Sequence, residues 1–172
     1  MKNQQLEQVA DLFVGDWSVS ITNQRWLDDK TTTTRGTAKG EWLGDAFVQL
    51  RAWFEGDGNA IFGDTALDQP DDLGQPALYF VFGRSDARNR FVALSHDERG
   101  VLRVFDFTLD ADSWMLHRGD PDFHQRLIGR VEGNQILVHP DISEDQGATW
   151  VKDFDMTFTR RDSWRANERA PV

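Results

Sequence analysis

The chain of 172 residues contains no cysteine. This absence excludes disulfides, thiolate nucleophiles, iron–sulfur clusters and zinc sites built from cysteine. Only His, Asp and Glu remain as side-chain metal ligands, and none of the four histidines has the closely spaced second histidine of a strong zinc motif. We therefore expect no protein-bound metal.

Positive charge is also scarce, since 19 Lys and Arg face 29 Asp and Glu and the net charge is −10 at pH 7. Such a chain repels polyanions, so we expect neither a nucleic-acid partner nor a membrane partner. No apolar run approaches the roughly 20 residues of a membrane helix, and the first eight residues contain no apolar signal segment. We expect a cytoplasmic protein; its oligomeric state stays open, and a homodimer is compatible with the sequence.

Familiar catalytic motifs are missing as well. The chain has no Gly-x-Ser-x-Gly elbow, and the glycines of Gly36-Thr37-Ala38-Lys39-Gly40 do not have P-loop spacing. Whether the protein is an enzyme is therefore uncertain from its motifs.

Aromatic residues, in contrast, are plentiful: 7 Trp, 12 Phe and 1 Tyr. So much ring surface must fill a core or line a ligand cavity. The length favours one domain, which we place at residues 1–161, followed by a polar tail at 162–172 that we expect to fray.

Hydrophobic periodicity predicts one helix, from Asn3 to Phe13, ended by Gly15. The remaining chain alternates short apolar segments with Gly, Asp, Asn and Pro, which is typical of an antiparallel sandwich or barrel. Short connections favour sequential hairpins, so we expect an all-β fold: a single antiparallel up-and-down barrel of about eight to ten strands with a short N-terminal helix. The predicted strands are 16–25, 32–43, 46–55, 59–66, 77–84, 89–96, 100–110, 112–118, 123–132, 134–141 and 149–161.

Alternation along three of these strands predicts which side chains point inward. In 149–161 the aromatic face also carries Lys152, in 100–110 it carries Arg103, and in 123–132 it carries Gln125. Polar groups among rings are more typical of a ligand cavity than of a dry core, because an unpaired buried charge is costly. The strand 46–55 does not reveal which of its faces looks inward.

The sequence resembles a known family. Gly15-Asp16-Trp17 and the late Arg160 are similar to the Gly-x-Trp and closing-strand Arg of calycin barrels, which include lipocalins, fatty-acid-binding proteins and nitrobindin-like proteins. The stretches from Arg99 onward, through Trp114-Met115-Leu116-His117-Arg118 to Thr149-Trp150, resemble an uncharacterised family of small bacterial calycin-like barrels, a domain of unknown function. The resemblance implies a barrel with a pocket, in which the guanidinium lies on the indole.

Nitrobindin-like relatives hold haem through a histidine in the C-terminal part of the barrel, and 149–161 contains none. We therefore expect no haem or other cofactor.

Together these observations predict a small-molecule-binding barrel for a largely apolar or aromatic ligand that carries an anionic or carbonyl group. The expected ligand-binding residues are Arg103, Phe105, Trp114, Arg118, Phe123, Gln125, Trp150, Lys152 and Phe154. Other interpretations are a barrel filled by its own rings and an internal network in which the inward cations only brace the sheet.

The resemblance also implies an alternative, since some calycin-like barrels of natural-product pathways act as cyclases. A cofactor-independent cyclase or isomerase would use the cavity as its active site and stabilise negative charge with Arg103, Arg118 or Lys152. The sequence identifies no nucleophile for it.

Overall fold

The computed structural model describes residues 2–55, 77–96 and 100–161. The chain begins with a short 3-10 helix η1 (Gln4–Leu6) and continues into helix α1 (Glu7–Phe13). The expected helix is confirmed, and its apolar positions Leu6, Val9, Ala10 and Phe13 are all buried.

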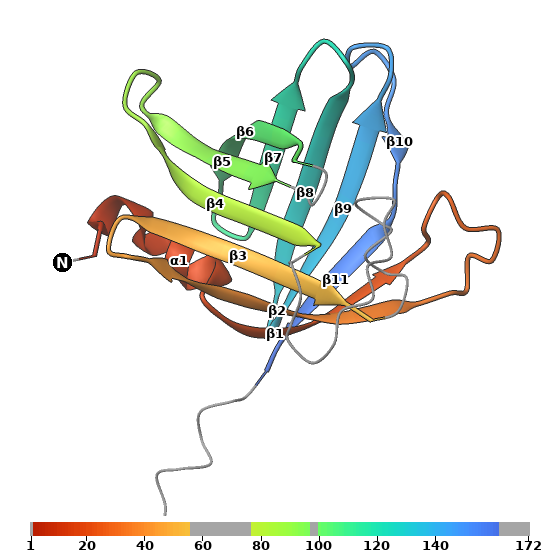
Figure 1. Ribbon diagram of the computed structural model, residues 1–172, viewed down its shortest axis with the longest axis horizontal. Coiled ribbons are helices and arrows are strands. Elements are labelled where there is room, and N and C mark those ends of the chain that lie inside the picture. The colour runs from red at the N-terminus through yellow and green to blue at the C-terminus, as the bar shows by residue number, and fades with distance from the viewer. Residues whose placement is uncertain (1, 56–76, 97–99, 162–172) are drawn as a thin grey trace, which may run out of the picture.

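Everything after α1 is antiparallel β-structure (Figure 1). The strands are β1 (Gly15–Thr22), β2 (Thr34–Leu43), β3 (Phe47–Phe54), β4 (Leu78–Ser85), β5 (Arg90–His96), β6 (Leu102–Leu109), β7 (Ser113–Gly119), β8 (His124–Glu132), β9 (Gln135–Ser143), β10 (Val151–Lys152) and β11 (Asp155–Arg160). The predicted strand 59–66 and the tail 162–172 lie outside the described residues.

The sheet closes on itself. Each strand from β1 to β8 pairs with the next one along the chain, and β11 pairs with both β1 and β9. Within the described part of the chain this gives a closed ten-strand barrel of up-and-down topology, because β10 extends the line of β11 along β9. The predicted fold class is confirmed.

The final strand is interrupted where the sequence predicted a continuous one. Lys152 pairs with Asp141 and Met156 pairs with Val138, so three residues on the last strand face two residues on β9. One extra residue of this kind is a β-bulge, and it shifts the inward and outward alternation by one position. The side chains before the bulge therefore change faces relative to the prediction.

Burial also decides the orientation of β3, which the sequence left open. Val48, Leu50 and Ala52 are buried and point inward, whereas Gln49 and Arg51 lie on the outer side. There Glu41 accepts hydrogen bonds from both Gln49 and Arg51.

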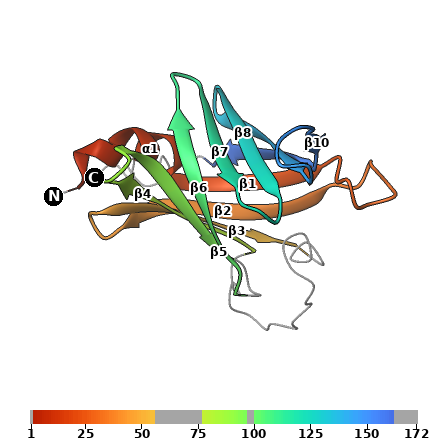
Figure 2. The ribbon, with the colours of Figure 1, turned by 90° about the horizontal axis from the view of Figure 1, so that it is seen from above.

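One end of the barrel, called the floor below, is closed by α1 and the start of β1 (Figures 1 and 2). The ring of Phe13 stacks on Phe82 at 4.7 Å and meets the edge of Trp114 at 5.4 Å. Gly40 is required beneath the helix end, because a Cβ there would lie 1.9 Å from the carbonyl oxygen of Phe13. The helix is thus fitted closely to the sheet.

Trp17 and Arg160 form a cross-strand pair at the floor. The guanidinium lies 4.2 Å from the ring centre of Trp17, whose side chain is 2% exposed. Arg160 also donates hydrogen bonds to backbone carbonyls at the end of α1, the shortest to Val14 at 2.7 Å, and the indole donates to Phe13 at 3.0 Å. The predicted contact of Arg160 with Trp17 is confirmed.

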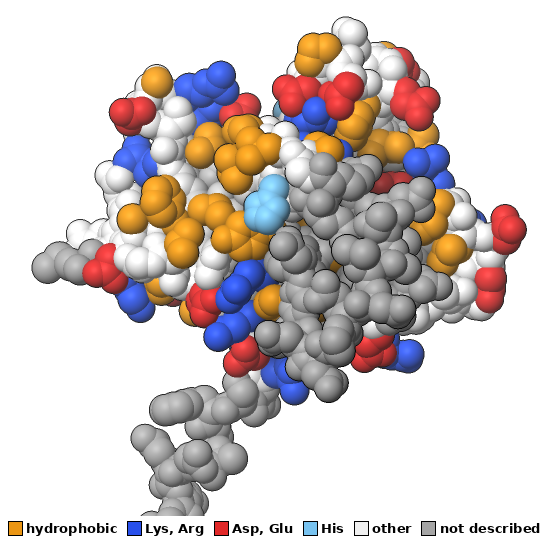
Figure 3. All heavy atoms as spheres, in the orientation of Figure 1, with side chains coloured by type: hydrophobic (Ala, Val, Ile, Leu, Met, Phe, Trp, Pro, Cys, Tyr) orange, Lys and Arg blue, Asp and Glu red, His pale blue; other side chains and the backbone are white. Residues whose placement is uncertain are grey.

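The opposite end, called the mouth below, contains the starts of β4, β6 and β8 and the ends of β5, β7 and β9. Figure 3, which has the orientation of Figure 1, shows apolar side chains gathered on the outer face of the barrel. Strands β2, β3 and β6 carry exposed large apolar side chains: Leu43, Phe47, Leu102 and Val104.

Candidate functional site

The barrel interior holds a small cavity near the mouth, called the mouth cavity below, with a volume of about 60 Å³. Seven of its lining side chains are apolar and three are polar. They are Leu78, Phe80, Ser95, Arg103, Phe105, Gln125, Leu127, Pro140, Phe154 and Met156. Four predicted site residues therefore meet here: Arg103, Phe105, Gln125 and Phe154.

Neighbouring strands place the polar members of this lining. Ser95 and Arg103 lie directly opposite each other on β5 and β6, and Gln125 stands at the start of β8. Ser95 was not among the predicted site residues. Its alternation with the buried Ala93 along β5 is the signal that indicates an inward position.

Arg118 is buried beside this cavity but serves the turn between β7 and β8. Its Nε donates to Asp120 and its Nη2 donates to Asp122, each at 2.7 Å. The hydrogen bond from Arg118 lowers the pKa of Asp122 below 3.8. This pairing matches the bracing interpretation of an inward cation.

Phe123 lies beneath the two mouth arginines. Its ring centre is 4.7 Å from the guanidinium carbon of Arg118 and 5.9 Å from that of Arg103. Phe123 therefore links the braced turn to the edge of the mouth cavity.

The inward orientation expected for Lys152 and Trp150 is wrong, and the bulge is the reason. Lys152 is half exposed and its Nζ lies 2.6 Å from a carboxylate oxygen of Asp155. Trp150 lies outside the barrel, where the guanidinium of the outward-facing Arg126 stands 4.2 Å from its ring centre. Neither residue lines the mouth cavity.

Trp114 points inward as predicted but belongs to the floor, since it stands near the start of β7. Its partner across the sheet is Gly129, and a Cβ at that glycine would lie 2.0 Å from the indole. The glycine thus leaves room for the ring.

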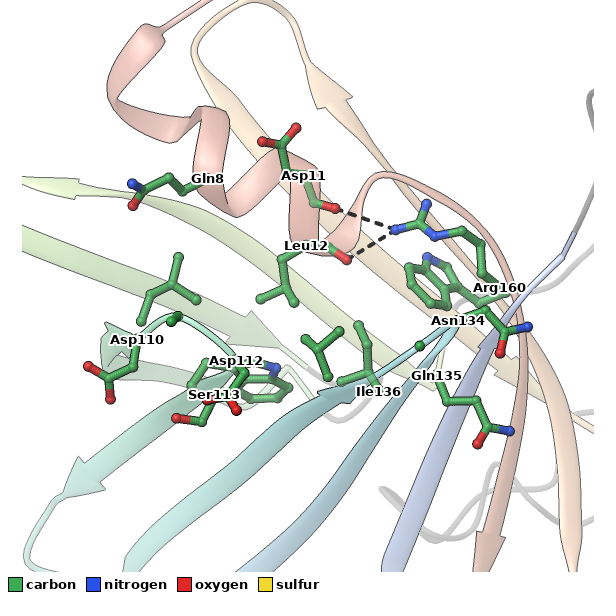
Figure 4. A pocket seen from close by; sticks show the side chains of 16 residues that line it. Gln8, Asp11, Leu12, Asp110, Asp112, Ser113, Asn134, Gln135, Ile136 and Arg160 are labelled. Atoms are coloured by element: carbon green, nitrogen blue, oxygen red, sulfur yellow. Dashed lines mark hydrogen bonds between the residues drawn. The ribbon is translucent and has the colours of Figure 1, made fainter.

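A second and larger cavity lies at the floor, between α1 and the turns that join β6 to β7 and β8 to β9 (Figure 4). This floor cavity measures about 570 Å³. Its lining consists of Gln8, Asp11, Leu12, Trp17, Leu109, Asp110, Ala111, Asp112, Ser113, Trp114, Val131, Gly133, Asn134, Gln135, Ile136 and Arg160. No sequence pattern indicates this cavity, because its residues come from distant segments that only the closed sheet brings together.

Two aspartates near the mouth have perturbed pKa values of opposite sign. Hydrogen bonds from Thr149, with a further one from Ser143, lower the pKa of Asp145 from 3.8 to about 2. Burial raises the pKa of Asp153, against the hydrogen bond that it accepts from Arg25. Neither residue lines the mouth cavity, so these shifts describe the surrounding loops.

Across residues 2–55, 77–96 and 100–161, no three His, Asp or Glu side chains are grouped so that they could hold a metal ion. Within the same ranges, no helix has the length and apolarity needed to cross a membrane.

Comparison with known proteins supports the fold. No family model and no curated protein matches the chain. Among solved structures, the crystal structure of Rv2717c from M. tuberculosis aligns with a TM-score of 0.58 and 10% sequence identity, covering 94% of this chain and 99% of that chain. This likeness concerns the fold alone, which in the described residues is a closed ten-strand antiparallel barrel.

Proposed function

We propose that the protein binds a small, largely apolar or aromatic molecule at the mouth of the barrel and holds the anionic or carbonyl group of this ligand in the mouth cavity. The observation that carries this proposal is the grouping of Ser95, Arg103 and Gln125 in an otherwise apolar lining. Guanidinium, amide and hydroxyl groups all donate hydrogen bonds, and such bonds to an anion strengthen where water is excluded.

The size of the cavity limits what enters it. A volume of about 60 Å³ equals the share of about two water molecules, whereas whole ligands occupy sites of about 300 to 1,000 Å³. Only a head group such as a carboxylate fits there. The body of the ligand must lie farther out, toward Phe123 and the turn that Arg118 braces.

The alternative of a cyclase receives less support from this arrangement. Of the three cations that it requires, Arg118 is engaged with Asp120 and Asp122, and Lys152 lies outside the barrel. Arg103 alone among them lines the mouth cavity.

The test uses octanoate and its neutral analogue 1-octanol as probes, with the methionine methyl groups observed by NMR. The chain has 3 Met, and Met156 lines the mouth cavity. We expect octanoate to shift the Met156 signal, which Met156→Leu assigns, and to bind at least tenfold more tightly than 1-octanol. Arg103→Met should weaken octanoate binding by about 10- to 100-fold, as expected when a hydrogen bond to a charged group is lost.

Arg88→Met is the matched control, because Arg88 is 62% exposed in the turn between β4 and β5, away from the mouth. It should bind octanoate as the unchanged protein does. Equal binding by Arg103→Met and Arg88→Met, or an unmoved Met156 signal at saturating octanoate, would contradict the proposal.

A further inference from the structure

The floor cavity is a second candidate binding site, distinct from the mouth cavity. Its volume of about 570 Å³ falls within the range of about 300 to 1,000 Å³ that is typical of small-molecule sites. It shares no lining residue with the mouth cavity, and the two lie at opposite ends of the barrel. Its ligand can therefore have different chemistry.

The inner part of the floor cavity is apolar. Figure 4 shows Leu12 of α1 and Ile136 of β9 pointing toward each other across the space. Leu109 and Val131 add further apolar surface, and Trp17 and Trp114, which are 2% and 5% exposed, contribute indole rings. This part suits the apolar or aromatic body of a ligand.

The rim of the floor cavity carries acidic side chains. Asp11 comes from α1, while Asp110 and Asp112 come from the turn between β6 and β7, and all three are exposed. In the part of the chain that the structure describes, no cation forms an ion pair with any of them. Backbone hydrogen bonds hold the turn, from Asp110 to Ser113 and from Val131 to Asp112, each at 2.8 Å.

The cation in the lining, Arg160, is already engaged. Its guanidinium stacks on Trp17 and donates to the carbonyl oxygens of Val14, Asp11 and Leu12 (Figure 4). An anionic ligand would therefore meet three carboxylates and a cation that is bound to backbone. A cationic ligand would meet carboxylates and aromatic rings, both of which attract positive charge.

The nitrogen edge of the Trp114 ring lies against Gly129, its partner across the sheet. The side chain of Trp114 is 5% exposed, and its indole Nε1 is buried with no hydrogen-bond partner. A ligand in the cavity therefore contacts the ring of Trp114 and not its N–H group.

From the volume, the apolar inner part, the acidic rim and the engaged Arg160 we infer that the floor cavity binds a small organic amine, whose apolar or aromatic body fills the inner part and whose ammonium group lies at the acidic rim. The body packs between Leu12 and Ile136, and the ammonium group faces Asp110 and Asp112. This site is independent of the proposed anion site at the mouth.

Three probes of similar shape and different charge test the inference: 2-phenoxyethylamine, 2-phenoxyethanol and phenoxyacetate. Each is titrated at about 0.15 M salt, where charges more than about 8 Å apart are largely screened. The readout is the indole N–H signal of Trp114 in an NMR spectrum, assigned by Trp114→Phe. We expect a saturable shift with the amine, at least fivefold weaker binding of the alcohol, and the weakest binding of the anion.

Charge variants distinguish an effect of the acidic rim from an effect of the overall negative charge of the protein. The double variant D110N/D112N should weaken amine binding at least fivefold and remove the preference over the alcohol. The matched control D28N/E144Q removes the same two charges at exposed positions away from the floor cavity and should bind the amine normally. Leu12→Phe should reduce binding of both the amine and the alcohol by filling the space, and Val131→Phe provides a second filling variant should the first not fold.

Several outcomes would overturn the inference. Equal binding of the three probes, equal loss in the two double variants, or no saturable shift of the Trp114 signal would each remove it. Arg103→Met should leave amine binding unchanged, so the mouth and floor proposals fail separately. A protein that binds the amine but not octanoate contradicts only the proposal for the mouth cavity. A protein that binds octanoate but not the amine contradicts only the inference for the floor cavity.

Discussion

The two ends of the barrel use their arginines differently. At the floor, Arg160 binds backbone carbonyls and the ring of Trp17, so it fixes helix α1 to the first and last strands. At the mouth, Arg118 binds carboxylates of a turn, and Arg103 lines a cavity. Contacts to backbone and buried rings stabilise the fold itself, whereas a cation beside a cavity can act on a ligand. Four predictions examine this comparison.

The largest effect is expected for the tryptophan of the floor. Trp17→Ala should lower the free energy of unfolding by about 3 to 5 kcal/mol, because it removes a large ring that is 2% exposed. Trp26→Ala is the comparison at the mouth, since Trp26 is 43% exposed and meets the edge of Phe154 at 5.6 Å. It should cost about 1 kcal/mol. Denaturant unfolding of both variants measures the difference. Equal losses of unfolding free energy would contradict the expected contrast between floor and mouth.

A smaller effect is expected where the helix crosses the sheet. Gly40→Ala should cost about 3 kcal/mol, because the new methyl group would lie 1.9 Å from the carbonyl oxygen of Phe13 and α1 would have to lift. Gly119→Ala at the mouth meets its nearest side-chain atom at an ordinary 3.5 Å. It should change stability by less than about 0.5 kcal/mol. Thermal unfolding of the two variants, with amide exchange in α1, checks both values.

The arginine that caps the floor should matter more than one at the mouth surface. Arg160→Met should cost about 2 kcal/mol, through the lost cation–π contact and the hydrogen bonds to the helix end. Arg25→Met removes a half-exposed ion pair with Asp153, at 3.2 Å, and should cost at most about 1 kcal/mol. Urea titrations of both variants give the ranking, and a larger loss in Arg25→Met would reverse the interpretation.

The smallest effect concerns pH and the loop at the mouth. Hydrogen bonds from Thr149 and Ser143 lower the pKa of Asp145 from 3.8 to about 2, so its ionised form stabilises the loop above pH 3.8. This stabilisation is lost as the pH falls through about 2. The amides of Gly147 and Thr149, which donate to Ser143 and Asp145, should then exchange faster.

The floor supplies the control for this prediction. The amide of Val14 donates to the carbonyl of Ala10 at 2.8 Å and depends on no carboxylate, so its exchange should not follow the same titration. Asp145→Asn should speed exchange of the loop amides at neutral pH. A loop unaffected by this substitution would show that the carboxylate does not hold it.

Much of the mouth could be predicted from the sequence. Alternation placed Phe105, Gln125 and Arg103 on the inner face, because unbroken strands expose every second residue to the same side. The same rule failed for Trp150 and Lys152, since a bulge of one residue reverses the faces and leaves no clear mark in the sequence. The pairing of Arg118 with its own turn also escaped, because a periodic pattern does not show which partner a buried cation finds.

The class of fold could be predicted from sequence patterns alone. Periodicity of 3.6 in one segment and alternation in the others are local patterns that depend on neighbouring residues. The contact of Arg160 with Trp17 was implied by the resemblance to calycin barrels. The size and position of the cavities, in contrast, follow from the tertiary structure. The mouth cavity is small because rings from many strands fill the interior, and the floor cavity exists because α1 and two distant turns meet above the closed sheet. Such volumes depend on packing among residues far apart in the chain, which no local pattern records.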